Sequence, residues 1–321
     1  MSKLVAIFEN SQRLALIAVE EAQRFGHPAV DVEHLFLALA LSETAAGISL
    51  REAGVTIDDA REAVQAEHDE RLAALGVRDV PVPAVRMPTA GLGEIEWNER
   101  ALGLFSRATG DGDGAALLQA LIDEPGGFVS AVLQHLDVDP DVVLREAEPA
   151  KVAPGASAEP EIVDGGWWQV SHSAYVPASV HEVWVLLDDV TRRPEWDTAL
   201  AAVRPVEPER SGRWIGEART RPSGRGRWRV PRRARISIIE RIEREECRRI
   251  AWQTTYPRLD ESYDRRLRIK LEEQPRGTRV HLTLQGRRPR VLANVRLRVR
   301  CFLAASELTR LASGISRRFR S

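Results

Sequence analysis

A proline-containing segment near the middle of the chain separates two parts of opposite charge. Residues 149–165 hold three prolines and many small residues. Such a segment buries too little apolar surface to offset the entropy of ordering, and proline keeps it extended. Residues 1–150 carry 11 Lys and Arg against 26 Asp and Glu, a net charge of −15, whereas the remainder carries 35 against 21, a net charge of +14. We therefore expect two domains, residues 1–148 and 166–321, joined by the linker 149–165.

The overall composition narrows the class of protein. A length of 321 residues fits about two domains, and each half is long enough for its own core. No apolar run approaches the ~18 residues that span a bilayer, and the N-terminus does not have the pattern of a signal peptide. Cys247 and Cys301 form neither a disulfide framework nor a metal-ligand spacing. We expect a cytoplasmic protein with no metal and no cofactor.

Apolar residues recur at helical spacing in the first half. The first predicted helix ends at Gly26, which is followed by His27 and Pro28. Asp31 is a suitable N-cap for the second helix. A third helix is predicted over 45–52, and Asp58 opens a fourth.

This four-helix unit is repeated along the chain. Residues 50–58 resemble residues 133–141, displaced by 83 positions, and Leu35 and the helix around it correspond to Leu117, displaced by 82. Self-similarity of this kind is typical of repeat architectures. The first domain is therefore predicted to be an all-α tandem repeat of two four-helix units.

These residues resemble the Clp N-terminal domain, the double repeat that precedes the AAA+ modules of Clp unfoldases. The resemblance rests on 19–22, Gly26-His27, 32–39 and 50–58. It implies a domain that docks substrates and adaptors. The P-loop pattern Gly-x-x-x-x-Gly-Lys-Ser/Thr, which cradles nucleotide phosphates, does not occur in the sequence, so no ATPase module is expected.

In one branch of that family, a Glu-His pair in each repeat helps to hold a phosphorylated arginine. Glu33-His34 keeps the pair in the first repeat, whereas the second has Ala115-Ala116. The resemblance therefore implies Glu33 and His34 as candidate residues for binding a peptide or phosphoarginine. Another interpretation needs no ligand: an acidic residue is favoured in a first helical turn by the helix dipole, and His34 can be a buried structural imidazole.

The second half alternates strands with two helices. A strand is predicted over 167–176, followed by a helix capped by Ser179, a loop over 188–197, several strands from about 200 to 286, and a long helix over 291–318. This order predicts an α+β domain with a curved antiparallel sheet around one long C-terminal helix. The space between them would be a natural cavity for an apolar ligand.

Residues 177–184 and 194–197 resemble the SRPBCC superfamily of START-like, polyketide cyclase/dehydrase-like helix-grip proteins. The resemblance implies a hydrophobic pocket, but the ligands of such proteins vary so widely that fold alone does not assign function. The candidate cavity-lining residues are Trp184, Trp252, Val295, Val299 and Phe302.

No catalytic residue is predicted. His172, His181 and His281 are candidate bases, but none neighbours a nucleophile or an orienting carboxylate in a known motif. The arginine- and tryptophan-containing stretches 224–235 and 285–290 could contact the phosphates of nucleic acid or an anionic lipid or membrane surface, form a solvated strand face, or pair with the acidic first domain.

The expected function is that of a non-ATPase adaptor or accessory protein of the Clp protease system. Its first domain would bind a protein client, a modified peptide or a Clp partner, and its second an apolar small molecule or lipid. One alternative is a polyketide cyclase- or hydratase-like enzyme localised by its Clp-like domain, which a polar pair facing the cavity would favour. A second, less favoured alternative is a nucleic-acid-binding protein, whose affinity should fall steeply with salt.

Overall fold

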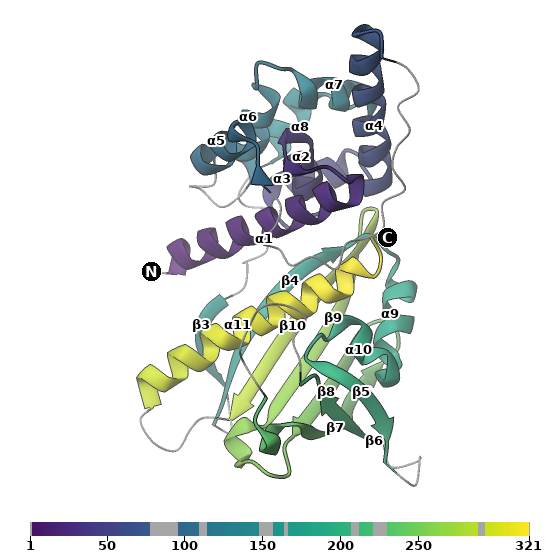
Figure 1. The fold of residues 1–321 in the computed structure, drawn as a ribbon. Helices are drawn as coiled ribbons and strands as arrows, with labels where there is room; N and C mark the ends of the chain where they lie inside the picture. Colours follow the sequence, from purple (N-terminus) through teal and green to yellow (C-terminus); the bar gives the residue numbers. More distant parts are fainter. Residues whose placement is uncertain are drawn as a thin grey trace. The chain divides into compact units, whose positions relative to one another are not determined.

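The computed structural model of the chain describes residues 2–77, 96–108, 114–147, 157–163, 166–206, 212–220, 230–287 and 293–320. The chain divides into two compact units, residues 3–153 and 154–321. Figure 1 shows that the first unit is built of helices and the second of a large sheet with helices. No helix within the described residues combines the length and the apolar character needed to cross a membrane.

The first unit is an all-α tandem repeat, which confirms the prediction. The four helices of the first repeat are α1 (Ser2–Phe25), α2 (Val32–Ala40), α3 (Ala45–Glu52) and α4 (Ile57–Ala74). Those of the second repeat are α5 (Glu99–Ala108), α6 (Ala115–Ile122), α7 (Phe128–His135) and α8 (Pro140–Glu146). The predicted N-cap is also confirmed, because the Asp31 side chain accepts a hydrogen bond at the start of α2.

The turn between the third and fourth helices is the same in both repeats. The residue that leaves the helix has a positive φ, 95° at Gly54 and 55° at Asp137. The next amide, that of Val55 or Val138, donates to a carbonyl five residues earlier at 3.0 Å. This is the hydrogen-bond pattern of a helix C-terminus closed by a left-handed residue. The sequence similarity of 50–58 and 133–141 therefore reflects a shared turn.

Two short strands, which the sequence analysis did not predict, join the repeats. β1 (Ala29–Val30) pairs in parallel with β2 (Glu96–Trp97). The hydroxyl of Ser49 on α3 also donates to the carbonyl of Val143 on α8 at 2.7 Å, and Ser49 is fully buried. The two repeats thus share one interior.

The second unit contains an eight-stranded antiparallel sheet in the order β3-β4-β10-β9-β8-β7-β6-β5. The strands are β3 (Ser157–Val163), β4 (Trp167–Val176), β5 (Leu200–Pro205), β6 (Arg213–Ala218), β7 (Ile236–Glu245), β8 (Arg249–Thr255), β9 (Arg265–Gln274) and β10 (Gly277–Arg287). The helices are α9 (Val180–Asp188), α10 (Arg193–Trp196) and α11 (Ala293–Arg317). This confirms the predicted helix-grip fold.

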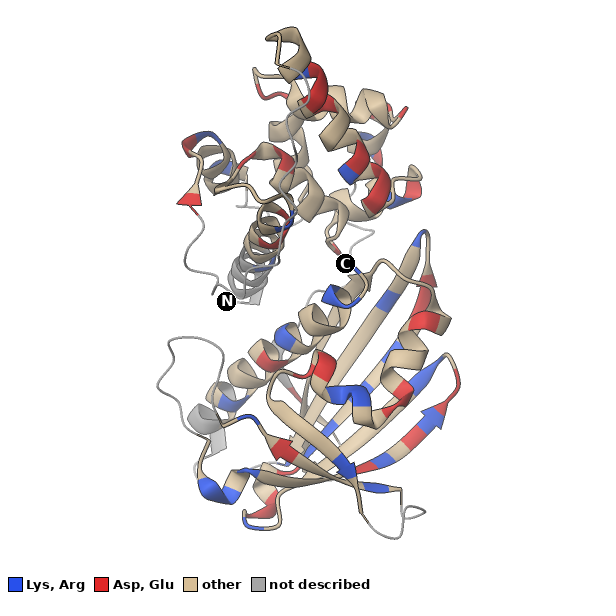
Figure 2. Ribbon diagram, turned by 45° about the vertical axis from the view of Figure 1, so that its right-hand side comes forward, with Lys and Arg blue, Asp and Glu red and all other residues tan. Residues whose placement is uncertain are grey.

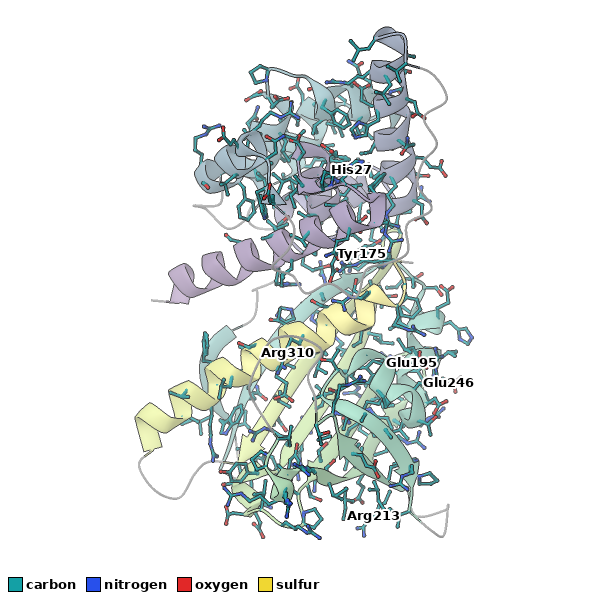
Figure 3. The ribbon with its side chains drawn as sticks, in the orientation of Figure 1. His27, Tyr175, Glu195, Arg213, Glu246 and Arg310 are labelled. Atoms are coloured by element: carbon teal, nitrogen blue, oxygen red, sulfur yellow. The ribbon has the colours of Figure 1, made fainter. Side chains whose placement is uncertain are left out.

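One face of the sheet is covered by the long helix α11, which contacts β3, β4 and β10 (Figure 1). Residues on α11 at 297, 301, 304, 308, 311 and 315 are buried at helical spacing and belong to the core. Beyond the helix, Arg318 donates to Glu195 on α10 at 2.6 Å, and Figure 3 labels this glutamate. The residues that follow α11 are therefore held to α10, the short helix that precedes β5.

Two predictions about local structure were wrong. Residues 157–163 of the predicted linker form β3, while residues 148–156 and 164–165 lie outside the described residues. β3 is an edge strand whose pairing with β4 is irregular between Ser157 and Glu161, and such an edge tolerates Pro160, which has no amide hydrogen. The region after α9, predicted as a loop, contains α10, whose second residue is Pro194, a position where proline is accepted.

The turn at Asp137 generates a test of stability. Asp137→Gly should stabilise the second repeat by up to about 1 kcal/mol, because glycine adopts a positive φ without the steric cost of a Cβ. The control Asp141→Gly, inside α8, should destabilise it by about 0.5–1 kcal/mol. Hydrogen exchange of the amides of α7 and α8 measures both. A similar loss of protection in the two variants would contradict the assignment of the turn.

Candidate functional site

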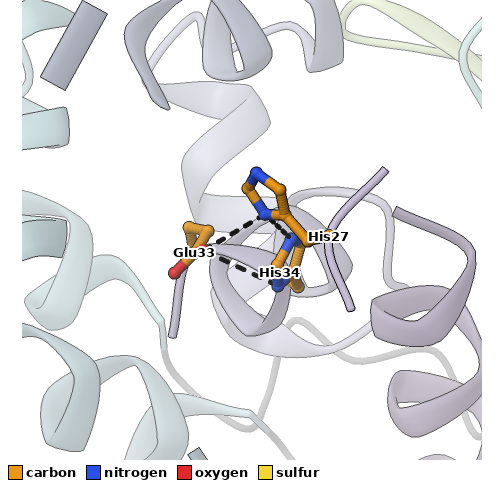
Figure 4. Close-up of side chains that lie close together, drawn as sticks. All are labelled: His27, Glu33 and His34. Carbon is orange, nitrogen blue, oxygen red and sulfur yellow. Dashed lines mark hydrogen bonds and ion pairs between the residues drawn. The ribbon is translucent and has the colours of Figure 1, made fainter. Parts of the chain in front are cut away.

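The first unit gathers three histidines around one glutamate. Glu33 and His34 lie in the first turn of α2, His27 follows the end of α1, and His68 lies on α4. Figure 4 shows His27, Glu33 and His34 converging. We call these four residues the histidine cluster. The sequence predicted only the Glu-His pair, because His27 and His68 come from other segments of the chain.

Hydrogen bonds fix the protons of this cluster. The amide of Asp31 donates to His34 Nδ1 at 2.9 Å, so neutral His34 carries its proton on Nε2. His34 Nε2 lies 3.0 Å from His27 Nδ1 and therefore donates to it. His34 is fully buried, and burial lowers its pKa to about 4. It acts as a neutral link between the α2 cap and His27.

Glu33 is a buried carboxylate next to these imidazoles. Its Oε1 lies 3.6 Å from His27 Nδ1 and 3.5 Å from His68 Nε2. Burial opposes the ionised form, but the interactions with His27 and His68 outweigh it and hold the pKa of Glu33 well below its ordinary value. With Glu33 only 5 % exposed, the two residues predicted to bind a ligand are together but largely covered. Their ligand role stays a prediction.

An arginine at the repeat junction continues this polar region. Arg100 Nη2 lies 3.1 Å from Asp31 Oδ1, and its Nη1 lies 3.2 Å from Glu124 Oε1. Burial opposes the charged form of Arg100, but the carboxylates of Asp31, Glu124 and, least of the three, Glu33 raise its pKa. The Arg100 side chain is 40 % exposed. The sequence analysis missed this cation because its partners lie far away in the chain.

An open hollow lies beside the turn that joins α3 to α4. Its volume is about 410 Å³. Its lining combines small or apolar residues with acidic and imidazole groups: Ala53, Gly54, Val55, Asp59, Glu62, Ala63, Ala66, His135 and Leu136. We call it the α4 groove. It was missed from sequence because both repeats contribute to it.

Two side-chain groups in the first unit have the donor atoms for a metal ion: His27, Glu33 and His34, and Glu67, Glu70 and His135. In the first group, both ring nitrogens of His34 are already used in hydrogen bonds. In the second, Glu67 Oε1 lies 2.5 Å from Arg71 Nε, and its Oε2 lies 3.4 Å from His135 Nε2. Hydrogen bonds and ion pairs within the protein therefore explain why the donor atoms of each group lie close together.

The residues predicted to line a cavity in the second unit separate into two sets. Trp184 and Trp252 are 3 % and 1 % exposed and belong to the core. Val299 and Phe302 are 55 % and 57 % exposed, because they lie outside the buried stripe of α11. The prediction that these two residues line the cavity was therefore wrong, because their side chains do not face the sheet. The side chain of Val295 lies outside the described residues.

The inner face of the sheet also carries polar groups that the sequence analysis did not predict. Arg265 begins β9, and its guanidinium carbon lies 5.4 Å from the Trp168 ring centroid. Burial raises the pKa of Glu307 on α11, against the effect of Arg265. Burial likewise raises the pKa of Tyr256, and the charge of Glu307 adds to this shift. The interior of the second unit is therefore not wholly apolar.

The histidines of the second unit have different surroundings. His172 is 2 % exposed, and His181 Nδ1 lies 3.9 Å from Cys247 Sγ. His281 lies 2.8 Å from both Ser173 Oγ and Glu272 Oε2, and so has the hydroxyl and carboxylate neighbours that the sequence did not reveal. These three residues come from β4, β9 and β10, and cross-strand polar pairs of this kind stabilise a sheet.

Much of the basic charge on the second unit is locally compensated. Figure 2 shows Lys and Arg interleaved with Asp and Glu along its strands. Arg244 lies 2.8 Å from Asp188, for example, and Arg268 lies 3.8 Å from Glu243. Residues 221–229 and 288–290, which hold much of the predicted basic stretches, lie outside the described residues. The described strands do not form the uniform basic stripe that is typical of nucleic-acid binding.

The low pKa of His34 predicts an acid-sensitive first unit. In the unfolded chain His34 takes up a proton near pH 6.5, whereas the folded protein resists this down to about pH 4. Between these pH values the unfolded state therefore binds more protons than the folded state. As the pH is lowered from 6.5 to 4, the free energy of unfolding should fall by about 3 kcal/mol. Urea unfolding followed by helical circular dichroism measures it. The dependence should flatten in His34→Gln and persist in His181→Gln; an equal slope in both variants would contradict the assignment.

Two family models match the chain. Residues 9–81 match the Clp repeat (R) N-terminal domain, and residues 168–316 match the family described as polyketide cyclase / dehydrase and lipid transport. No curated protein matches the sequence. Both resemblances found in the sequence are thereby confirmed.

Solved structures similar to the second unit have low sequence identity. A START superfamily protein from Mycobacterium smegmatis is 14% identical with a TM-score of 0.36, and TTHA0849 from Thermus thermophilus is 17% identical with a TM-score of 0.35. Each similarity covers 47% of this chain and 97% of the other. By its two family-model matches, the chain combines a Clp repeat N-terminal domain with a domain of the polyketide cyclase/dehydrase and lipid transport family.

Proposed function

We propose that this protein is a non-ATPase adaptor or accessory protein of the Clp protease system that couples protein recognition to the binding of an apolar small molecule or lipid. The observation that carries the proposal is the presence of a Clp repeat domain and a lipid-transport-family domain in one chain. The 321 residues contain no P-loop, so they supply recognition without nucleotide-driven unfolding.

The α4 groove supports the protein-binding part of the proposal. Its apolar lining, including Ala53 and Leu136, offers surface that a partner side chain can bury. Asp59 and Glu62 in the same lining are exposed carboxylates. A segment of a client or Clp partner that combines apolar and basic side chains complements both features.

The region around Glu33 and Arg100 supports recognition of a modified arginine. A phosphorylated arginine carries a guanidinium and a phosphoryl group, which need an anion and a cation respectively. Glu33 is the ionised carboxylate, His34 holds the first turn of α2 in place, and Arg100 is the partly exposed cation acted on by Glu33. The repeat junction therefore offers both charges that such a ligand requires.

The enzyme alternative draws support from one observation. Tyr256 and Glu307 act on one another electrostatically in the interior of the second unit, and burial favours the protonated form of both. A phenol and a carboxylic acid next to an apolar ligand are the groups that a cyclase- or hydratase-like reaction would use for proton transfer. Turnover lost in Glu307→Gln would favour this alternative over simple binding.

Native mass spectrometry tests the ligand-binding part. The gently purified full-length protein should show a mass excess that disappears on denaturation, because an apolar molecule held between the sheet and α11 is released when the core opens. Identification of the released compound would then name the ligand. A mass equal to that of the polypeptide, together with no binding of any added lipid, would contradict this part of the proposal.

Calorimetry with a phosphoarginine peptide tests the protein-binding part. Glu33→Gln should weaken binding at least about tenfold, because a hydrogen bond to a charged group contributes about 1.5–3 kcal/mol. Arg100→Gln should weaken binding of the phosphorylated peptide and leave that of the unmodified peptide unchanged. Glu146→Gln, an exposed position on α8 outside both the repeat junction and the α4 groove, serves as the control. If Glu33→Gln bound the peptide as the parent protein does, that residue would be removed from the site.

A further inference from the structure

Four N–H groups in the second unit are buried without a hydrogen-bond acceptor among the described residues: Arg193 Nη1, Trp196 Nε1, Trp252 Nε1 and Arg265 Nη1. Trp196 and Trp252 are each 1 % exposed, and Arg193 is 7 % exposed. Buried donors are nearly always paired, because an unpaired donor loses its hydration without compensation. Four such donors from arginine and tryptophan in one domain are therefore unusual for a core.

Two of these donors lie on the inner face of the sheet. Arg265 pairs with Thr254 across β9 and β8, and Trp252 pairs with Leu267 two residues along, so Arg265 and Trp252 point to the same side. Leu267 is 3 % exposed and belongs to the core beneath α11. The two N–H groups therefore face the interior.

The neighbouring strand provides the space for Arg265. Gly286 on β10 pairs with both Arg265 and Trp168. A Cβ at Gly286 would lie 2.9 Å from Arg265 Nη1 and 2.4 Å from Trp168 Cζ2, closer than real Cβ contacts allow. Glycine at this position lets the guanidinium lie over the indole inside the unit.

The other two donors lie on α10. Arg193 directs its Nε to Asp197 Oδ2 at 3.2 Å, and its guanidinium carbon lies 5.6 Å from the Trp196 ring centroid. This leaves Arg193 Nη1 and Trp196 Nε1 without an acceptor among the described residues. Trp196, Trp252 and Trp168, the indole that Arg265 covers, belong to one hydrophobic core, so the α10 pair and the sheet pair lie in the same core.

The carboxylate beside the α10 pair is already in use. Asp197 accepts from Arg193 Nε at 3.2 Å, which leaves Arg193 Nη1 without an acceptor among the described residues. The core thus presents cationic and neutral donors to whatever occupies it.

We infer that the interior of the second unit binds an amphiphile by its anionic head group, a carboxylate or a phosphate monoester that accepts hydrogen bonds from Arg265 and Trp252, while the apolar tail lies against the core beneath α11. This inference rests on the proposed binding of an apolar ligand and names its chemical class. An uncharged alcohol of the same chain length satisfies the donors less well and binds more weakly.

Calorimetry with decanoate, decyl phosphate and decanol tests this inference on the full-length protein. At least one of the two anions should bind about tenfold or more tightly than decanol, because hydrogen bonds to charged groups are the stronger ones. The tighter of the two anions identifies the head group. Arg265→Gln should abolish the preference for the anion.

Arg268→Gln is the matched control. Arg268 lies on the same strand but is exposed and pairs with Glu243 on the outer face, so the preference should remain. Trp252→Phe removes one donor with little change of shape and should reduce the preference, which keeps the test valid even if Arg265→Gln fails to fold.

The outcomes separate the two proposals. Equal affinity for all three compounds would overturn the anionic head group but leave the apolar ligand in place. A preference that survives in both Arg265→Gln and Trp252→Phe would overturn the assignment of these donors. If none of the three compounds bound, although near-UV circular dichroism showed a normally packed core, the inference would be overturned. The ligand-binding part of the proposed function would be overturned with it.

Discussion

An antiparallel sheet of eight strands has an apolar face that must be covered, and in the second unit one long helix does most of this. The buried stripe of α11 packs against β3, β4 and β10, and the chain end beyond it is held by the ion pair between Arg318 and Glu195. The closest backbone contacts of this single helix are with one side of the wide curved sheet. Arg265 and Trp252 face the interior from the neighbouring strands β9 and β8, and the proposed ligand chemistry rests on this placement.

In the first unit, the interior is formed by both four-helix repeats together, and contacts between the repeats hold it. Ser49 bonds across to Val143, β1 pairs with β2, and Arg100 connects Asp31 to Glu124. The start of α2 lies at this junction, and its cap is completed by an imidazole whose neutral form is enforced by burial. The same contacts that join the repeats therefore bring Glu33 and an exposed cation into one polar region.

Much of the fold could be predicted from local pattern. The tandem repeat, the Asp31 and Ser179 caps and most strands follow from helical or alternating periodicity and from turn residues, which act over a few positions. β3 and α10 were missed because they depend on context: Pro160 is tolerated only since β3 lies at an edge, and α10 is a single turn. The exposed positions of Val299 and Phe302 depend on the rotation of α11, which its apolar composition alone does not set.

The sequence by itself determined the two-domain plan, the family of each domain and the pairing of Glu33 with His34, because these are properties of neighbouring residues and of spacing. Only the tertiary structure decided which side chains meet. His68 reaches Glu33 from another helix, Arg100 reaches Asp31 from the other repeat, and Arg265 turns inward where Gly286 leaves room. Such contacts join residues far apart in the chain, so whether a polar group is buried, paired or left as a donor without an acceptor is fixed by packing and by no local pattern.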